Sequence, residues 1–154
     1  NTTSNTTNNT TNNTNNTNNT TTNTTNNTTN INNITNNIII KNYGDENIQL
    51  SNSYLNGLLK GVYGAIPKLI KITHFNNKIP ENSNIRITNK KLPYAEIRKN
   101  DKWEILDKEE LIELLVDDKY YTLEDYYNEM DKSDLTEYQI DTIEAFKNQY
   151  NRSR

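Results

Sequence analysis

The sequence predicts an α+β domain, in which helices flank a small antiparallel three-stranded meander and a disordered Asn/Thr tract precedes the fold. Three observations support this. Residues 1–37 contain only Asn, Thr, one Ser and two Ile. Three short segments between residues 85 and 106 alternate apolar and polar side chains, as half-buried strands do. The regions on either side, residues 51–74 and 107–150, repeat apolar side chains at helical spacing instead.

The Asn/Thr tract is predicted to be a disordered polar tether, which we place at residues 1–42. It has too few apolar side chains to offset the entropy lost on ordering its backbone, and the first charged residue is Lys41. Asn-rich composition is also typical of fibril-forming segments, which is the alternative interpretation. The folded domain is accordingly expected at residues 43–154.

The first helical region covers residues 51–74. Ser51 or Ser53 is a candidate N-cap, and the apolar side chains that follow recur on one side of a helix. Pro67 cannot lie inside a continuous helix without removing a backbone hydrogen bond. The pattern therefore predicts a break, followed by a second helix that has Pro67 in its first turn and ends near His74.

The meander is predicted from strands at residues 85–88, 94–98 and 103–106, which turn-forming residues separate. Trp103 begins the third strand. Because a domain this small needs its single Trp inside, we expect Trp103 to pack in the core, and stacking on a base or sugar is the alternative.

Residues 107–150 are predicted to form the second helical region. Asp107 followed by Glu110 is typical of a capping box at a helix start. Thr122 with Asp125 indicates a restart of the helix, and a last helix begins near Leu135. The region is therefore expected to hold separate helices joined by short breaks.

Charge is divided unevenly along the folded domain. Residues 60–102 hold ten Lys or Arg and three Asp or Glu, a net charge of +7. Residues 103–146 hold three Lys and fifteen Asp or Glu, a net charge of −12. Three interpretations follow: the two halves attract each other within one chain, the basic half binds a phosphate backbone or an acidic partner, or copies of the chain associate head to tail.

Composition and missing motifs leave several protein classes without support. The chain has no Cys, so it has neither a disulfide framework nor a thiolate metal site. No apolar run reaches membrane-spanning length and no signal-peptide pattern is present, so we predict an intracellular protein without a membrane partner. The sequence has neither a Gly-rich phosphate loop nor a Gly-x-Ser-x-Gly elbow, and we predict no cofactor and no catalytic residue.

One spaced motif lies at the end of the first helical region and continues through the meander. Its residues are His74, Phe75, Asn76, Pro80, Glu81, Asn82, Asn84 and, at the close of the strand pair, Trp103. Because of this motif, the segment of residues 60–115 resembles a C-terminal domain found in many uncharacterised proteins of giant, mimivirus-like DNA viruses. Members of that family often carry an N-terminal zinc finger or another DNA-associated module, so the resemblance implies an accessory role in the host cytoplasm or the virion. In this chain the Asn/Thr tract stands where such a module would be.

The motif is interpreted as structural. His74, the single His, is expected to bond the last carbonyls of its helix, while Asn76, Asn82 and Asn84 satisfy the backbone of the following loop and Glu81 caps it. The alternative is a metal or acid/base site of a nuclease-like kind, formed by His74 and Glu81 with Asn76 or Asn84. With one His, no Cys and no second carboxylate, the motif has too few strong ligands, and we predict no metal site.

The remaining candidates are surface residues. Those for nucleic-acid contact are basic and lie in the meander: Lys90, Lys91, Arg98, Lys99 and Lys102. Those for a protein interface are two tyrosine pairs, Tyr120 with Tyr121 and Tyr126 with Tyr127, because neighbours on a helix cannot all face one buried stripe. The sequence thus predicts a non-enzymatic interaction or self-association domain. A nucleic-acid-binding accessory domain and a nuclease-like enzyme centred on His74 are the alternatives.

Overall fold

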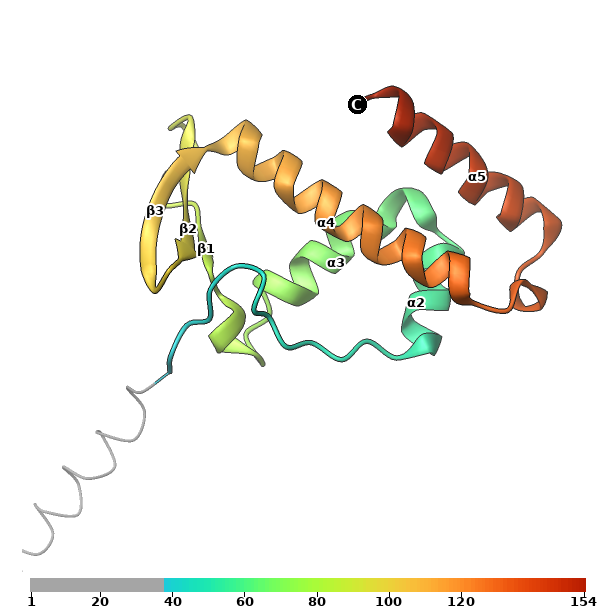
Figure 1. The fold of residues 1–154 in the computed structure, drawn as a ribbon, viewed down its shortest axis with the longest axis horizontal. Coiled ribbons are helices and arrows are strands. Elements are labelled where there is room, and N and C mark those ends of the chain that lie inside the picture. The colour runs from blue at the N-terminus through green and yellow to red at the C-terminus, as the bar shows by residue number, and fades with distance from the viewer. Residues whose placement is uncertain (1–37) are drawn as a thin grey trace, which may run out of the picture. The chain divides into compact units, whose positions relative to one another are not determined.

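The computed structural model describes residues 38–154, of which Ile40–Arg154 form one compact unit (Figure 1). Residues 1–37 of the tether predicted for residues 1–42 lie outside the described residues. The folded unit begins slightly earlier than residue 43, because Lys41 N donates to Glu81 O at 2.8 Å and Tyr43 N donates to Arg98 O at 2.8 Å. The first bond attaches the segment before the first helix to the loop that precedes the sheet, and the second attaches it to the sheet itself.

The α+β class is confirmed for the described residues, which hold a three-stranded antiparallel sheet and four α-helices. In chain order the elements are α2 (Asn52–Leu59), the 3-10 turn η1 (Val62–Gly64), α3 (Ala65–His74), η2 (Pro80–Asn82), β1 (Ile85–Arg86), β2 (Tyr94–Lys99), β3 (Lys102–Asp107), α4 (Lys108–Glu129), η3 (Lys132–Asp134) and α5 (Glu137–Arg152).

The first two helices are separated as predicted. Ser51 is the N-cap of α2, and its hydroxyl oxygen accepts a hydrogen bond from Tyr54 N at 3.2 Å. The turn η1 leads into α3, where Pro67 is the third residue. An α-helix has no internal acceptor for the backbone N–H groups of its first turn, so Pro67 removes no hydrogen bond there.

The sheet is a meander in the order β1-β2-β3. The turn between β2 and β3 has Asn100 and Asp101 in the left-handed region, with φ of 49° and 59°, as a type I′ hairpin requires. Strand β1 ends at Arg86, earlier than the predicted residue 88. The chain then enters a turn in which Asn89 Oδ1 accepts from Lys91 N at 2.9 Å, and this turn takes the place of further strand pairing.

Helix α4 runs without interruption for 22 residues, so the predicted restart at Thr122 is wrong. The Thr122 hydroxyl donates to Asp118 O, four residues earlier and at 2.8 Å, instead of capping a new helix. The predicted start is correct, since Asp107 Oδ1 accepts from Glu109 N at 2.7 Å. Helix α5 begins one residue after Thr136, which forms a capping box with Gln139.

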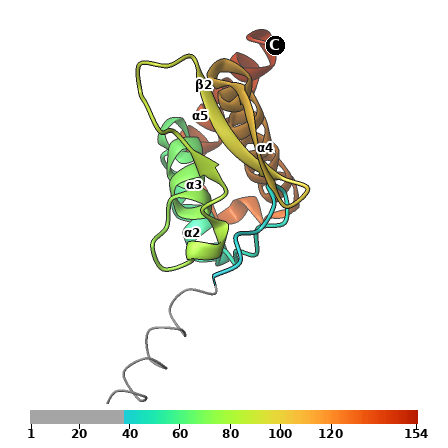
Figure 2. The ribbon, with the colours of Figure 1, turned by 90° about the vertical axis from the view of Figure 1, so that its left-hand side faces the viewer.

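Two apolar clusters hold these elements together. The larger joins α2, α3, α4 and α5 around Leu59, Leu69 and Tyr120. The smaller packs Ile97 and its neighbours, on the inner face of the sheet, against the start of α4 at Leu111. In Figure 1 the sheet lies at the N-terminal end of α4, and in Figure 2, viewed from that end, the β2–β3 hairpin lies in front of α4.

Candidate functional site

His74 is the centre of a buried polar network at the end of α3. Its exposed fraction is 1 %, and Asn84 beside it is fully buried. His74 Nδ1 lies 2.9 Å from Asn84 Oδ1. Asn84 Nδ2 donates to Glu46 Oε1 at 2.5 Å and to Asn42 O at 3.2 Å, while the Tyr43 ring stacks on the imidazole. The network therefore ties α3 and the start of β1 to the segment before α2.

The network fixes the chemistry that His74 can perform. Because an amide oxygen can only accept, the imidazole donates from Nδ1. Its Nε2 is buried and has no hydrogen-bond partner among the described residues. The carboxylate near the ring is that of Glu46, 3.5 Å from Nδ1, and Glu81 takes no part. No group of three His, Asp or Glu side chains that could hold a metal ion occurs within residues 38–154. An enclosed, neutral imidazole of this kind supports the fold more readily than it serves a substrate.

The roles expected of Asn82 and Glu81 are corrected by the structure. The Asn82 side chain is fully buried, and neither of its amide atoms bonds to a described residue. The loop is closed by backbone bonds instead, because η2 supplies them itself: Asn82 N donates to Ile79 O at 3.1 Å. Glu81 contributes its backbone oxygen, which accepts from Lys41 N. Asn76 does act on the loop, since its Oδ1 accepts from Lys78 N at 3.0 Å.

The buried imidazole predicts that stability depends on pH. Burial lowers the pKa of His74 and Lys119 lowers it further, whereas the bond to Asn84 and the charges of Glu46 and Asp118 raise it. With the folded pKa below the usual 6.5, the unfolded chain binds more protons between the two values. The stability that depends on a neutral His74 is therefore fully present above the pKa of His74 in the unfolded chain. It is lost as the pH falls toward the pKa of His74 in the folded chain.

We expect the free energy of unfolding to fall by up to about 1.4 kcal/mol per pH unit below about pH 6.5, measured by urea denaturation. His74→Asn is the matched variant, because it keeps a side-chain N–H near Asn84 and removes the single His. The slope between about pH 6.5 and about pH 5.5 should flatten in this variant. An equal slope in both proteins would show that His74 is not the titrating group.

A basic groove lies beside this network, on the outside of the molecule. It has a volume of about 490 Å³ and opens between α2, α3 and the residues that follow α3. Its apolar lining is Tyr54, Ile72 and Phe75, and its polar lining is Lys68, Lys71, Asn76, Asn77 and Lys78. Phe75 is 45 % exposed. The motif thus divides at the end of α3: His74 faces the interior, while Phe75 and Asn76 face the groove.

The Lys and Arg side chains of residues 60–102 form no ion pair within the described part of the chain. The ion pairs found there join Lys119 to Asp118, Lys147 to Glu124 and Glu144, and Arg154 to Glu113 and Asp117. The neutral imidazole of His74 lies 3.5 Å from Glu46. The attraction expected between the two charged halves therefore does not take the form of ion pairs between their described residues. Most of the basic groups are exposed and remain free for an external anion.

Trp103 lies on the outer face of the sheet, which corrects the prediction that it packs in the core. Side chains alternate between faces, and residues directly opposite in an antiparallel pair share a face. Buried Ile97 is opposite Glu104, so Trp103, opposite Arg98, is on the other face. Trp103 is covered by arginines instead: the guanidinium carbon of Arg86 is 3.6 Å from the ring centroid, and that of Arg98 is 5.8 Å away.

The residues predicted for nucleic-acid contact lie at both ends of the sheet. Lys90 and Lys91 are exposed in the loop between β1 and β2, and Lys108 Nζ donates to Lys90 O at 2.9 Å. Lys99 and Lys102 are cross-strand partners beside the hairpin turn. Of these residues, Arg98 shares the outer face with Trp103, whereas alternation puts Lys99 and Lys102 on the same face as Ile97 at the end of the strands.

The tyrosine pairs of α4 divide between interior and surface. Tyr120 and Tyr127 are 1 % and 2 % exposed, so their assignment to a partner interface is corrected. Helix α5 covers them, and Tyr150 stacks on Tyr120 with 3.5 Å between ring centroids. Tyr121 is 55 % exposed. Tyr126 is half-buried and donates to α2, so Tyr121 is the member most available to a partner.

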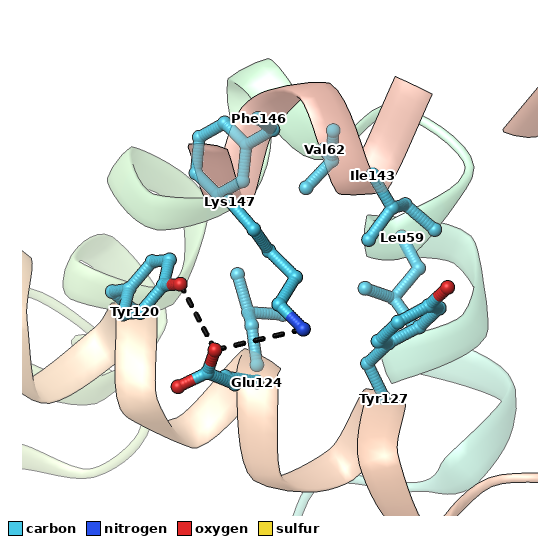
Figure 3. Close-up of a pocket in the computed structure, with 9 residues that line it drawn as sticks. Leu59, Val62, Tyr120, Glu124, Tyr127, Ile143, Phe146 and Lys147 are labelled. Carbon is cyan, nitrogen blue, oxygen red and sulfur yellow. Dashed lines mark hydrogen bonds and ion pairs between the residues drawn. The ribbon is translucent and has the colours of Figure 1, made fainter. Parts of the chain in front are cut away.

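Between α4 and α5 the core contains a small pocket, shown in Figure 3. Glu124 accepts from the Tyr120 hydroxyl at 3.0 Å and lies 3.6 Å from Lys147 Nζ. Burial and this hydrogen bond raise the pKa of Tyr120 to about 12. Since the pocket offers only about 10 Å³, it has room for no more than a water molecule and is not a ligand site.

Several residues of these surfaces were missed in the sequence. Glu46 lies in an irregular segment, where no periodicity marks a residue as buried. Arg86 could have been found, because side chains alternate along the first strand and its neighbour Ile85 is buried. Arg86 must therefore lie on the other face of the sheet. Lys68 and Lys71 could also have been found, since a spacing of three puts them on one side of a helix.

No protein-family model, curated protein or solved structure matches the chain. The resemblance of residues 60–115 to the giant-virus domain thus stays a prediction that rests on the motif residues. None of the helices between residues 38 and 154 combines the length and the apolar character that crossing a bilayer requires.

Proposed function

We propose that the folded unit is a non-enzymatic interaction domain that associates with a second copy of itself. The observation that supports this most directly is the absence of ion pairs, within the described residues, for every Lys and Arg of residues 60–102. A chain with a +7 segment and a −12 segment whose side chains form no ion pair with each other presents complementary surfaces to its own copies. The resemblance to an accessory viral domain, inside the host cell or the virion, is part of this proposal.

The acidic side of the contact is a corner formed by the end of α4, η3 and the start of α5. Its carboxylates are all exposed: Asp125, Glu129, Asp131, Asp134, Glu137 and Asp141. None of them forms an ion pair within residues 38–154. Lys132 lies within this acidic corner without an ion pair to these carboxylates, and its Nζ is 4.7 Å from the centroid of the Tyr127 ring. Tyr138, on α5, is 78 % exposed amid these charges.

The basic side is the basic groove. Lys68, Lys71 and Lys78 supply three positive charges, and Phe75 supplies an exposed apolar floor. The acidic corner offers the matching features, which are carboxylates and the Tyr138 ring. Two different surfaces make a head-to-tail contact, which closes into rings or continues as open chains. Because both sides are exposed, we expect the association to weaken strongly with salt.

Light scattering of the full chain tests this proposal. The mass should exceed that of a monomer at about 10 mM salt and return to it at about 1 M salt, where charges are screened beyond a few ångströms. Replacing Lys68, Lys71 and Lys78 with Gln should leave a monomer at both salts. The matched control replaces Lys90, Lys91 and Lys102 with Gln, which changes the charge equally at exposed sites outside the groove and should still associate.

Two results would contradict the proposal. A wild-type monomer at both salts would remove self-association altogether. Association that persists unchanged when the groove lysines are replaced would place the contact in other residues.

A further inference from the structure

The outer face of the sheet carries two arginines with no acidic partner. Neither Arg86 nor Arg98 forms an ion pair or a side-chain hydrogen bond within the described residues, and the Nε of Arg98 is buried without a partner. Glu96 is directly opposite Arg86 in the sheet and shares its face, yet their charged groups do not pair. Arg86 reaches over Trp103 instead, at 3.6 Å from the ring centroid.

The surroundings of this face are basic and exposed. Lys90 and Lys91 lie in the loop beside β1, and Lys99 and Lys102 flank the hairpin turn next to Trp103. Further along the same face, Ile105 is 69 % exposed. Guanidinium and aromatic groups thus share this face with the carboxylate of Glu96, and lysines lie beyond both ends of the strands.

We propose that this outer face binds single-stranded nucleic acid. An exposed guanidinium plane over an indole can stack on a base, and every base has a face that stacks in this way. Arg98 and the surrounding lysines would contact the phosphates, which fix position without reading sequence. This site is separate from the basic groove, so it is independent of the proposed self-association.

The geometry favours a single strand over a duplex. A duplex keeps its bases stacked inside, so a flat sheet face could reach only its phosphates. This face is formed by the three described strands and includes no helix that could enter a major groove. The stacking platform therefore has a use only where the bases are unpaired.

Fluorescence anisotropy with the full chain and a labelled oligothymidylate of about 12 nucleotides tests this site. Trp103→Ala should weaken binding on the order of tenfold, and Trp103→Phe, which keeps a ring, should restore most of it. Replacing Arg86 and Arg98 with Gln should weaken binding and lower the slope of log affinity against log salt by about 0.7, because Arg98 contacts a phosphate and about 0.7 counterion is released per neutralised phosphate.

Matched controls separate the site from general charge. Lys68→Gln with Lys71→Gln removes the same charge from the groove, and Tyr138→Ala removes an exposed aromatic ring from α5. Both should bind the oligonucleotide as the wild type does. The Lys pair also separates the two proposals, because it weakens self-association and leaves this site intact.

Three results would overturn the inference: no binding by the wild type, equal loss in the groove control, or unchanged binding when Trp103→Ala remains folded. Competition by poly-glutamate as effective as that by the oligonucleotide would also overturn it. In that case the face would recognise acidic protein surfaces and not bases.

Discussion

Tyr150→Ala is expected to lower the free energy of unfolding by about 3 to 5 kcal/mol, the usual cost of removing a buried aromatic ring. Tyr150 is 9 % exposed and stacks on Tyr120 with 3.5 Å between centroids. Its hydroxyl donates to Asp117, which Arg154 also contacts. This one ring therefore joins the end of α5 to the middle of α4, and its loss leaves a cavity and removes one of the hydrogen bonds of Asp117.

Tyr138→Ala is the matched control for this prediction. Tyr138 lies on the same helix but is 78 % exposed, so its removal should change stability by no more than about 0.5 kcal/mol. Urea denaturation followed by circular dichroism measures both variants. Equal stabilities would mean that α5 does not depend on Tyr150 for its attachment to α4.

Local signals in the sequence were sufficient for the element types. Ser51 and Asp107 cap helices because their side chains bond backbone N–H groups nearby, which needs no information about the rest of the fold. Alternation and turn residues likewise predicted the meander. Thr122 misled the prediction, since inside a helix the same hydroxyl can bond the carbonyl four residues earlier.

The choice of which face is buried could not be made locally. Ile85, Ala95 and Ile97 give the inner face, and the strand register then places Trp103 outside. A shift of one residue in that register would have buried Trp103, so the prediction failed on pairing and not on propensity. Tyr120 and Tyr127 show the same dependence, because only the return of α5 over α4 makes them part of the core.

The candidate surfaces were predicted unevenly for a related reason. Lys90, Lys91 and Lys102 were chosen from charge alone, and charge is visible in a sequence. Whether a charged group is neutralised depends on distant partners, so the absence of ion pairs for the basic segment needed the structure. The same holds for Glu46, because His74 and Asn84, its side-chain partners, lie 28 or more residues away along the chain.

Asn84→Ala is expected to lower the free energy of unfolding by about 2 to 5 kcal/mol, since it leaves buried polar groups unpaired. Asn84 is fully buried and bonds His74, Glu46 and the backbone of Asn42. The Glu46 carboxylate has an exposed fraction of only 8 % and would lose its short contact. Asn77→Ala is the control: Asn77 is exposed, and its loss should cost no more than about 0.5 kcal/mol.

A second background shows whether Asn84 acts through the buried charge. In a Glu46→Gln protein the partner of Asn84 is a neutral amide, which is less costly to leave unpaired than a carboxylate. Asn84→Ala should therefore cost at least about 1 kcal/mol less in that background than in the wild type, as a double-mutant cycle measures. Equal costs in the two backgrounds would mean that Asn84 stabilises the fold by packing alone, and that the network does not serve to hold Glu46 beside His74.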